Sequence, residues 1–228
     1  MQQLVLDMGL APRPSLDNFL ADGSADALAH LRLWAGNPLR SPVPTFLWGA
    51  SGSGKTHLLQ AVRDQVLGQG GGVGWLDATT LAPPEFDDRW AVVILDYCQL
   101  YTAAQQAAAF NWFVNAQTPV HGPARWVLAA ADCPPADLAL REDLRTRLGW
   151  GHVFQLHLLG EAERRAVLRR AADERGVLLA EEVMDFMLNR FSRDLSSLMT
   201  LLDRLDGYAL RTQRAITIPL IKAMLESE

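Results

Sequence analysis

Short apolar runs separated by longer polar or alanine-rich stretches mark the first two thirds of the chain. A strand buried on both faces requires such a run, and helical spacing follows several of them. The pattern predicts strands over Thr45–Trp48, Val73–Asp77, Trp90–Asp96, Trp126–Ala131 and Val153–Leu156, with helices opening at His57–Val62 and spanning Thr102–Ala116. This alternation is typical of an α/β fold with a doubly wound parallel sheet.

The pattern changes at Gly160, beyond which no stretch has the character of a strand. Apolar positions recur there at helical spacing, which indicates a small all-helical domain. The predicted helices are Glu161–Arg175, Glu181–Arg190, Asp194–Thr212 and a terminal one with Pro219 in its first turn. We therefore expect a base domain over residues 13–159, a helical lid over residues 160–228, and a hinge near Leu159–Gly160.

A glycine-rich octet stands between the first predicted strand and its helix. It reads Gly49-Ala50-Ser51-Gly52-Ser53-Gly54-Lys55-Thr56 and fits the phosphate-binding loop (P-loop) pattern at every required position. The glycines let backbone N–H groups face phosphate oxygens, Lys55 adds a positive charge, and the Thr56 hydroxyl can ligate Mg²⁺. The alternative is a glycine-rich turn with an incidental lysine, but strand, loop and helix follow in the order that phosphate binding needs. The octet thus predicts a bound nucleotide.

Asp96 is the second half of the predicted nucleotide site. It follows the apolar run Val92–Leu95 and emerges at the carboxyl end of a strand, where α/β sheets place their ligands. A carboxylate there can hold Mg²⁺ through water, together with Thr56; the alternative is a helix-capping or loop aspartate. The next residue is Tyr97, a poor general base at neutral pH, so we expect hydrolysis within one subunit to be weak.

The composition narrows the class of protein. The chain has 228 residues, a net charge of -5 and a pI near 5.5, which argues against broad direct binding to nucleic acid because that requires a dense basic surface. Basic residues gather over 141–175, but interleaved acidic residues make paired charges on solvated helix faces the default expectation and a local basic patch the alternative.

Targeting and metal signals are weak. No segment is apolar and long enough to cross a membrane, the N-terminus lacks a signal-peptide pattern, and Cys98 and Cys133 have neither disulfide-framework nor metal-ligand spacing. We expect a soluble cytoplasmic protein that does not contact membranes. Its expected metal is Mg²⁺ bound with the nucleotide.

Several segments together resemble the AAA+ module of the DnaA/Hda family of bacterial replication proteins. They are Gly49–Leu59, Asp96, Phe110-Asn111, Ala131–Pro135 and Glu142–Gly151. The most specific is the Arg-x-Arg-Leu-Gly-Trp-Gly run over residues 145–151, and the resemblance extends from about Ser15 to the C-terminus. Three features resemble the Hda branch of this family: the short N-terminus, the run Gln213–Lys222 and the lack of a following DNA-binding domain. The resemblance implies a P-loop AAA+ base with a helical lid, binding an adenine nucleotide, ADP or ATP.

The resemblance also implies roles for two residues beyond the P-loop. Arg147 matches the arginine finger of the family, which reaches across a subunit interface to the γ-phosphate of a neighbour. Its rival for that role is Arg145, and its plain alternative is a salt bridge. Asp132 falls at the sensor position at the end of its strand, where a polar group can order water near the phosphates. The alternative is an ordinary turn before Cys133-Pro134-Pro135.

The same resemblance implies a role for the first twelve residues. Gln3, Leu4, Leu6 and Met8 resemble the short peptide by which Hda docks into the DNA polymerase sliding clamp. The alternation of Leu4, Leu6 and Met8 fits equally well a first strand that packs on the core. In the clamp interpretation, residues 1–12 form a clamp-binding segment and DNA is reached indirectly, through the clamp.

One position departs from the family pattern. A sensor arginine usually opens the third lid helix, but here that position is Ser196. Arg193, three residues earlier, is the candidate substitute, although its side chain would approach from a different angle. Together with Tyr97, this suggests that the bound nucleotide is a structural or switching ligand. The function that the resemblance implies is a regulator that, with the DNA-loaded clamp, promotes hydrolysis of DnaA-bound ATP and represses reinitiation.

Two other functions remain open at this point. One is a self-contained P-loop ATPase, such as a helicase loader or a transposition helper, and the other is a clamp adaptor without catalytic effect. Self-association is compatible with each of them.

Overall fold

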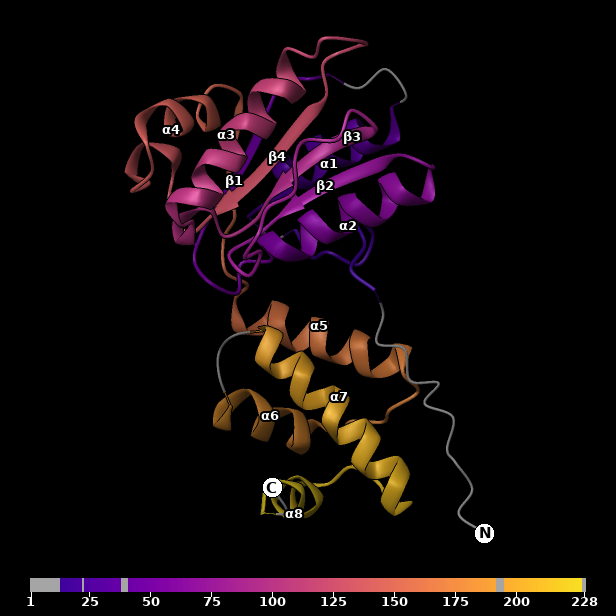
Figure 1. Ribbon diagram of the computed structural model, residues 1–228. Coiled ribbons are helices and arrows are strands. Elements are labelled where there is room, and N and C mark those ends of the chain that lie inside the picture. The colour runs from indigo at the N-terminus through magenta and orange to yellow at the C-terminus, as the bar shows by residue number, and fades with distance from the viewer. Residues whose placement is uncertain (1–12, 22, 38–40, 192–194, 227–228) are drawn as a thin grey trace. The chain divides into compact units, whose positions relative to one another are not determined.

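The computed structural model describes residues 13–21, 23–37, 41–191 and 195–226 (Figure 1). These residues fall into two compact units, which divide between Leu158 and Leu159. We call residues 14–158 the base unit and residues 159–226 the helical unit. Each is described by itself.

A five-stranded parallel sheet forms the centre of the base unit, in the order β2-β3-β4-β1-β5. The strands are β1 (Thr45–Trp48), β2 (Gly72–Leu76), β3 (Trp90–Leu95), β4 (Trp126–Ala131) and β5 (His152–Gln155). Each begins and ends within one residue of its predicted bounds. Because β1 lies between β4 and β5, Leu47 is aligned with Ala130 on one side and Phe154 on the other.

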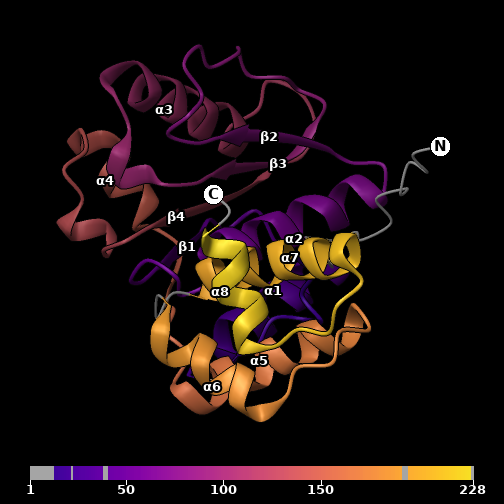
Figure 2. The same ribbon diagram turned by 90° about the horizontal axis from the view of Figure 1, so that it is seen from below.

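Helices cover both faces of this sheet. They are α1 (Ala25–Gly36), α2 (Lys55–Gly68), α3 (Ala103–Gln117) and α4 (Glu142–Leu148), with short 3₁₀ turns η1 (Cys98–Leu100) and η2 (Pro135–Asp137). The strands lie between α1 and α2 on one side and α3 and α4 on the other (Figure 2). Helices on both faces explain why the strands read as continuous apolar runs.

Alternate residues along the strands belong to two separate apolar cores, one on each face of the sheet. Val92 and Ile94 of β3 pack with α1 and α2, whereas Val93 and Leu95 pack with α3 and α4. All four side chains are fully buried. At about 25 cal/mol per Å² of buried apolar surface, such two-sided burial is the main stabilising contribution to the sheet.

The start of α3 fixes a loop at the carboxyl edge of the sheet. Thr102 and Gln105 form a capping box in which each side chain bonds the other's backbone N–H. The Gln105 amide also donates to the carbonyl oxygens of Asp77, Ala78 and Thr80, at 3.1, 3.2 and 3.0 Å. The segment after β2 is therefore tied to α3.

A polar contact joins α1 to the sheet. The hydroxyl of Thr45, at the start of β1, lies 2.9 Å from His30 Nε2 and accepts a hydrogen bond from the Trp126 indole at 3.2 Å. The imidazole rings of His30 and His152 are 4.6 Å apart. Burial lowers the pKa of His30, and the nearby His152 lowers it further.

We expect His30 to make the fold sensitive to mild acid. Because its pKa is lower in the folded than in the unfolded chain, the unfolded state takes up the proton more readily, and stability falls as pH drops below about 6.5. His30→Gln keeps a hydrogen-bonding side chain but cannot titrate. Urea unfolding from about pH 7.5 to about pH 5.5 should show a smaller loss of unfolding free energy in this variant than in the wild type. Equal losses would contradict the assignment.

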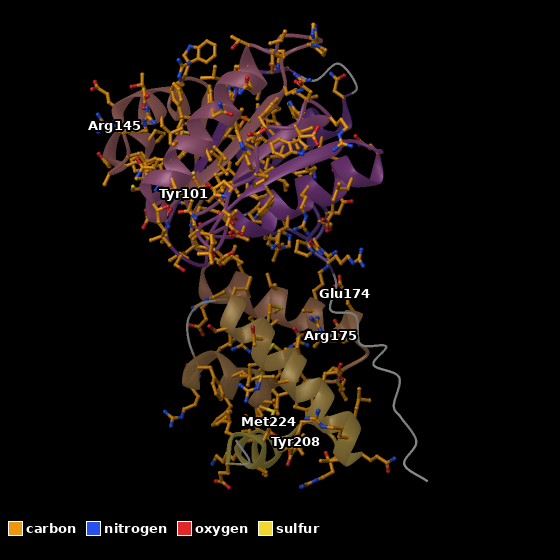
Figure 3. The ribbon with its side chains drawn as sticks, in the orientation of Figure 1. Tyr101, Arg145, Glu174, Arg175, Tyr208 and Met224 are labelled. Atoms are coloured by element: carbon orange, nitrogen blue, oxygen red, sulfur yellow. The ribbon has the colours of Figure 1, made fainter. Side chains whose placement is uncertain are left out.

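The helical unit contains α5 (Glu161–Glu174), α6 (Glu181–Arg190), α7 (Leu195–Thr212) and α8 (Ile218–Glu226). Its apolar core draws on every helix, including Leu168, Met187, Leu202 and Met224. Tyr208 of α7 packs against this core, and Figure 3 labels it beside Met224 of α8. None of the helices described is long and apolar enough to cross a bilayer.

Four arginines between residues 165 and 175 are paired with acidic residues of the helical unit. Arg165 bonds Glu181 and Asp185, Arg169 bonds Glu181, and Arg170 bonds Glu174. Arg175, labelled with Glu174 in Figure 3, bonds Asp203 of α7 at 2.7 Å. This agrees with the expectation of paired charges on solvated faces.

Candidate nucleotide site and arginine finger

The P-loop leaves the sheet from β1 and ends where α2 begins at Lys55. The Gly49 N–H donates to the carbonyl oxygen of Ala131 on β4 (3.3 Å), and Leu156 N–H donates to that of Trp48 (2.7 Å). Since the carboxyl ends of parallel strands share one edge of a sheet, Gly49, Asp96 and Asp132 come from the same edge.

Two of the P-loop glycines are required by the backbone itself. Gly54 adopts a left-handed conformation (φ 89°), which side-chain-bearing residues rarely tolerate. At Gly49, a Cβ atom would lie 2.2 Å from the carbonyl oxygen of Leu156, which is backbone and cannot move aside. At Gly54 a Cβ atom would also lie 2.6 Å from the Phe19 ring, so both glycines are needed for the packing of the loop against its own neighbours.

Lys55 is buried inside this loop. Its side chain is 8% exposed, and its ammonium donates to the carbonyl oxygens of Gly49 and Ala50, at 2.6 and 2.9 Å. Burial lowers the pKa of Lys55, while the carboxylates of Asp96 and Asp132 act in the opposite direction. The ammonium thus lies among the P-loop, Asp96 and Asp132, as a phosphate-binding lysine requires.

Asp96 is almost completely buried, at 1% exposure. One carboxylate oxygen accepts from the Thr56 hydroxyl at 2.7 Å and the other from the Tyr97 N–H at 2.9 Å. Burial raises the pKa of Asp96, opposed by these two hydrogen bonds and by the charge of Lys55. A hydroxyl and a carboxylate oxygen in contact form a donor set that fits Mg²⁺; Thr56 and Asp96 would hold the ion, which would neutralise the buried charge.

We expect Asp96→Asn to separate folding from metal binding. Because burial disfavours the ionised carboxylate, the amide should raise the unfolding free energy of the nucleotide-free protein at neutral pH. It should also reduce the Mg²⁺ contribution to nucleotide affinity about tenfold or more. Urea unfolding and calorimetric titration with and without Mg²⁺ measure the two effects. Asp64→Asn, which changes a surface carboxylate on α2, is the matched control.

Tyr97 occupies the place where a second carboxylate would activate water. Its backbone is left-handed (φ 54°), which costs of order 1 kcal/mol in a residue with a side chain, and its side chain is 43% exposed. The carboxylate of Asp77 interacts with Asp96 but is engaged otherwise, since it accepts from Trp75, Thr79 and Thr80. Burial raises the pKa of Asp77, but these hydrogen bonds outweigh it and the net shift is downward. Neither residue is suited to act as a general base.

Asp132 directly follows β4 and its side chain is exposed. Its charge acts on the Lys55 ammonium, so it faces the same space as the P-loop lysine. This placement is compatible with both the sensor role and the plain turn, because Pro135 opens the η2 turn three residues later.

Arg147 lies on α4. This helix is on the opposite side of the sheet from α2, the helix that follows the P-loop (Figure 2). Its side chain is exposed, and no carboxylate among the described residues lies within ion-pair distance of it. Its guanidinium carbon lies 5.2 Å from the centre of the Phe110 ring. Arg145, labelled in Figure 3, lies on the same helix and is half-buried.

Some of the predicted site residues cannot be placed. Gln3, Leu4, Leu6, Met8 and Arg193 lie outside the described residues. Ser196 belongs to the first turn of α7. Within the described ranges, no group of three or more His, Cys, Asp or Glu side chains is arranged to hold a metal ion.

Sequence reasoning missed two features around the site. One is the contact of Arg147 with Phe110, which joins residues far apart in the chain. The other is α4 itself, although Glu142 and Asp143 in its first turn and Arg145 and Arg147 in its last are a recognisable helix signature.

Two family models match the chain. The model described as the lid domain of Hda matches residues 161–225, and the model of the bacterial DnaA ATPase domain matches residues 10–72. A Haemophilus influenzae protein described as uncharacterized is 31% identical to this chain over 98% of either chain. The chain belongs to the DnaA/Hda family of AAA+ proteins. The lid match places its helical unit with the Hda type.

Solved structures of DnaA share the fold of this DnaA/Hda family member. Domain III of the Thermotoga maritima replication initiation protein DnaA is 21% identical with a TM-score of 0.76, covering 95% of this chain and 97% of that one. AMPPCP-bound DnaA from Aquifex aeolicus is 21% identical with a TM-score of 0.68, covering 89% and 68%. The predicted family and fold class, an α/β base with a parallel sheet followed by a helical domain, are confirmed.

A motor protein shares the fold as well. The Thermotoga maritima RuvB Holliday junction branch migration motor is 18% identical with a TM-score of 0.64, covering 96% of this chain and 73% of that one. At such identities the likeness concerns the fold alone, so the function of this DnaA/Hda family member has to be argued from its own residues.

Proposed function

We propose that this protein is a nucleotide-binding regulator that stimulates hydrolysis of ATP bound to the initiator DnaA. It would be recruited by the DNA-loaded sliding clamp through the segment Gln3–Met8 and would present Arg147 to the ATP site of DnaA. Loss of that ATP would inactivate the initiator and repress reinitiation. The observation that carries the proposal is the exposed guanidinium of Arg147, which has no carboxylate partner among the described residues.

The protein's own P-loop would hold ADP or ATP with Mg²⁺. The buried Lys55, the P-loop backbone conformation that Gly49 and Gly54 allow, and the contact between Thr56 and Asp96 support this. The lack of a free carboxylate beside Asp96 favours a ligand that is held rather than rapidly turned over. In this role the nucleotide stabilises the base unit while chemistry occurs in the partner.

Direct DNA binding is a poor alternative route to the initiator. The net charge is -5, and three of the four arginines of α5, namely Arg165, Arg169 and Arg170, are bonded to carboxylates of α5 and α6. Neutralising DNA phosphates requires unpaired basic groups on one surface. Recruitment through a protein that already encircles DNA avoids this requirement.

A single-turnover assay tests the proposal. DnaA loaded with labelled ATP is mixed with clamp on DNA, with this protein, or with both, and the bound label is followed from ATP to ADP. We expect rapid conversion only when both are present. Steady hydrolysis by this protein alone would favour a self-contained ATPase, and clamp binding without faster conversion would favour a non-catalytic adaptor.

A further inference from the structure

Two guanidinium groups lie close to the ring of Phe110, a half-buried residue of α3. The guanidinium carbon of Arg141 lies 4.9 Å from the ring centre, and that of Arg147 lies 5.2 Å from it. Both distances are within the range of a cation–π interaction. Two like charges beside one ring would repel each other unless one of them were neutralised.

Arg141 is the neutralised one. Its guanidinium makes two hydrogen bonds with the Asp143 carboxylate, both at 2.7 Å. Its backbone N–H donates to the Gln106 side chain on α3, at 2.9 Å, so the N-cap of α4 is tied to the helix that carries Phe110. Arg141 therefore serves as a fixed, paired group on one side of the ring.

Arg147 has the opposite character. Among the described residues it is absent from every ion pair, and the side chain found against its guanidinium is Phe110. An unsupported arginine samples many rotamers, and ordering it on binding lowers its conformational entropy. The ring can reduce this cost before a partner arrives.

An aromatic ring beside a guanidinium leaves its N–H donors and its charge available, whereas a carboxylate does not. A carboxylate would occupy the N–H donors of the guanidinium and cancel its charge, whereas a π-face attracts the cation without accepting its N–H groups in the same way. All five N–H donors of Arg147 thus remain available to an anionic group such as a phosphate. The arrangement holds the guanidinium in place and keeps it charged.

Phe110 itself is well placed to hold another side chain. It is half-buried and packs against the core of the α3 face, which includes Ala109 and Phe113 of the same helix. Its position is therefore set by the core, while part of the ring is left for the two arginines.

We propose that Phe110 is a positioning residue that holds Arg147 for insertion into the partner's nucleotide site. This inference rests on the proposed function, because it assigns Phe110 a role in that same step. It concerns the rate of hydrolysis in the partner and not the affinity for the partner. A residue that merely filled the core or the interface would not have this effect.

The test compares Phe110→Leu, which removes the π-face, with Phe110→Tyr, which keeps it. In single-turnover assays of DnaA-bound ATP with clamp on DNA, the concentration of each variant is varied. We expect Phe110→Leu to lower the limiting rate about fivefold with an unchanged half-saturating concentration, and Phe110→Tyr to restore the rate. Thermal unfolding and clamp binding of each variant verify that the fold is retained.

Arg147→Ala, alone and combined with Phe110→Leu, completes the design. If Phe110 acts through Arg147, the double variant should be no slower than Arg147→Ala. A raised half-saturating concentration without a rate change, or a wild-type rate for Phe110→Leu while Arg147→Ala is inactive, would overturn the positioning role alone. Normal stimulation by Arg147→Ala would overturn the proposed function and the inference with it. Should Phe110→Leu fail to fold, Phe110→Met keeps the volume without the ring and is judged by the same outcomes.

Discussion

Arg147→Ala is expected to abolish stimulation of ATP hydrolysis in DnaA, with a loss of about 10³-fold or more in the stimulated rate. An arginine finger places positive charge against the transferring phosphoryl group only in the transition state, so its removal lowers the rate far more than the affinity. Arg147 is exposed and makes no ion pair among the described residues, so folding should be unaffected. Clamp binding and nucleotide binding by the variant should equal those of the wild type.

The matched control for this prediction is Arg145→Ala. Arg145 lies two residues earlier on α4 and is half-buried. If only the total positive charge of α4 mattered, removing either arginine would reduce the stimulation of hydrolysis. Loss in Arg147→Ala alone identifies the finger. Loss in Arg145→Ala alone would transfer the role to that residue, and full activity of both would remove α4 from the mechanism.

The second large effect is expected from Lys55→Ala, which should lose stabilisation by nucleotide. A ligand present at 100 times its dissociation constant adds about 2.7 kcal/mol to the stability of the native state. For a chain of this size that corresponds to a rise of roughly 5–10 °C in melting temperature. The variant should show little of this rise with ADP or ATP, because the charge that meets the outer phosphates is gone.

Without nucleotide, Lys55→Ala should fold at least as well as the wild type. The ammonium is buried, and removing a buried charge relieves its desolvation. Lys222→Ala, which changes an exposed lysine of α8, serves as the control and should keep the full thermal shift. A wild-type shift in Lys55→Ala would contradict the assignment of the P-loop.

The sheet and the P-loop were predictable because their signals are local. The apolar run over Val92–Leu95 is buried on both faces, so its composition alone identifies a strand, and Asp96 at its end follows directly. The octet needs glycine where the backbone is left-handed or crowded, as at Gly54, and these glycines can be recognised directly in the sequence. The observed ends of the strands differ from the predicted ends by one residue at most, because hydrogen bonding rather than hydrophobicity determines where a strand ends.

Other features depend on contacts between distant segments. The prediction omitted α1, although Leu28, Leu31 and Trp34 follow a helical spacing, because the stretch stands between polar loops. The support of Arg147 by Phe110 was not predictable, because nothing in either segment indicates that α3 and α4 meet. The clamp-binding segment lies outside the described residues and stays a prediction.

The enclosure of Lys55 by the P-loop carbonyls also determines how the protein can be modified chemically. The chain has two lysines, and the other, Lys222, is exposed at the end of the helical unit, 6.0 Å from the Phe186 ring centre. An amine-reactive dye or surface linker therefore reacts with Lys222 in preference to Lys55, because the P-loop amine is shielded by its own backbone. A fluorophore at Lys222 would therefore report on the helical unit, where it would lie near the Phe186 ring.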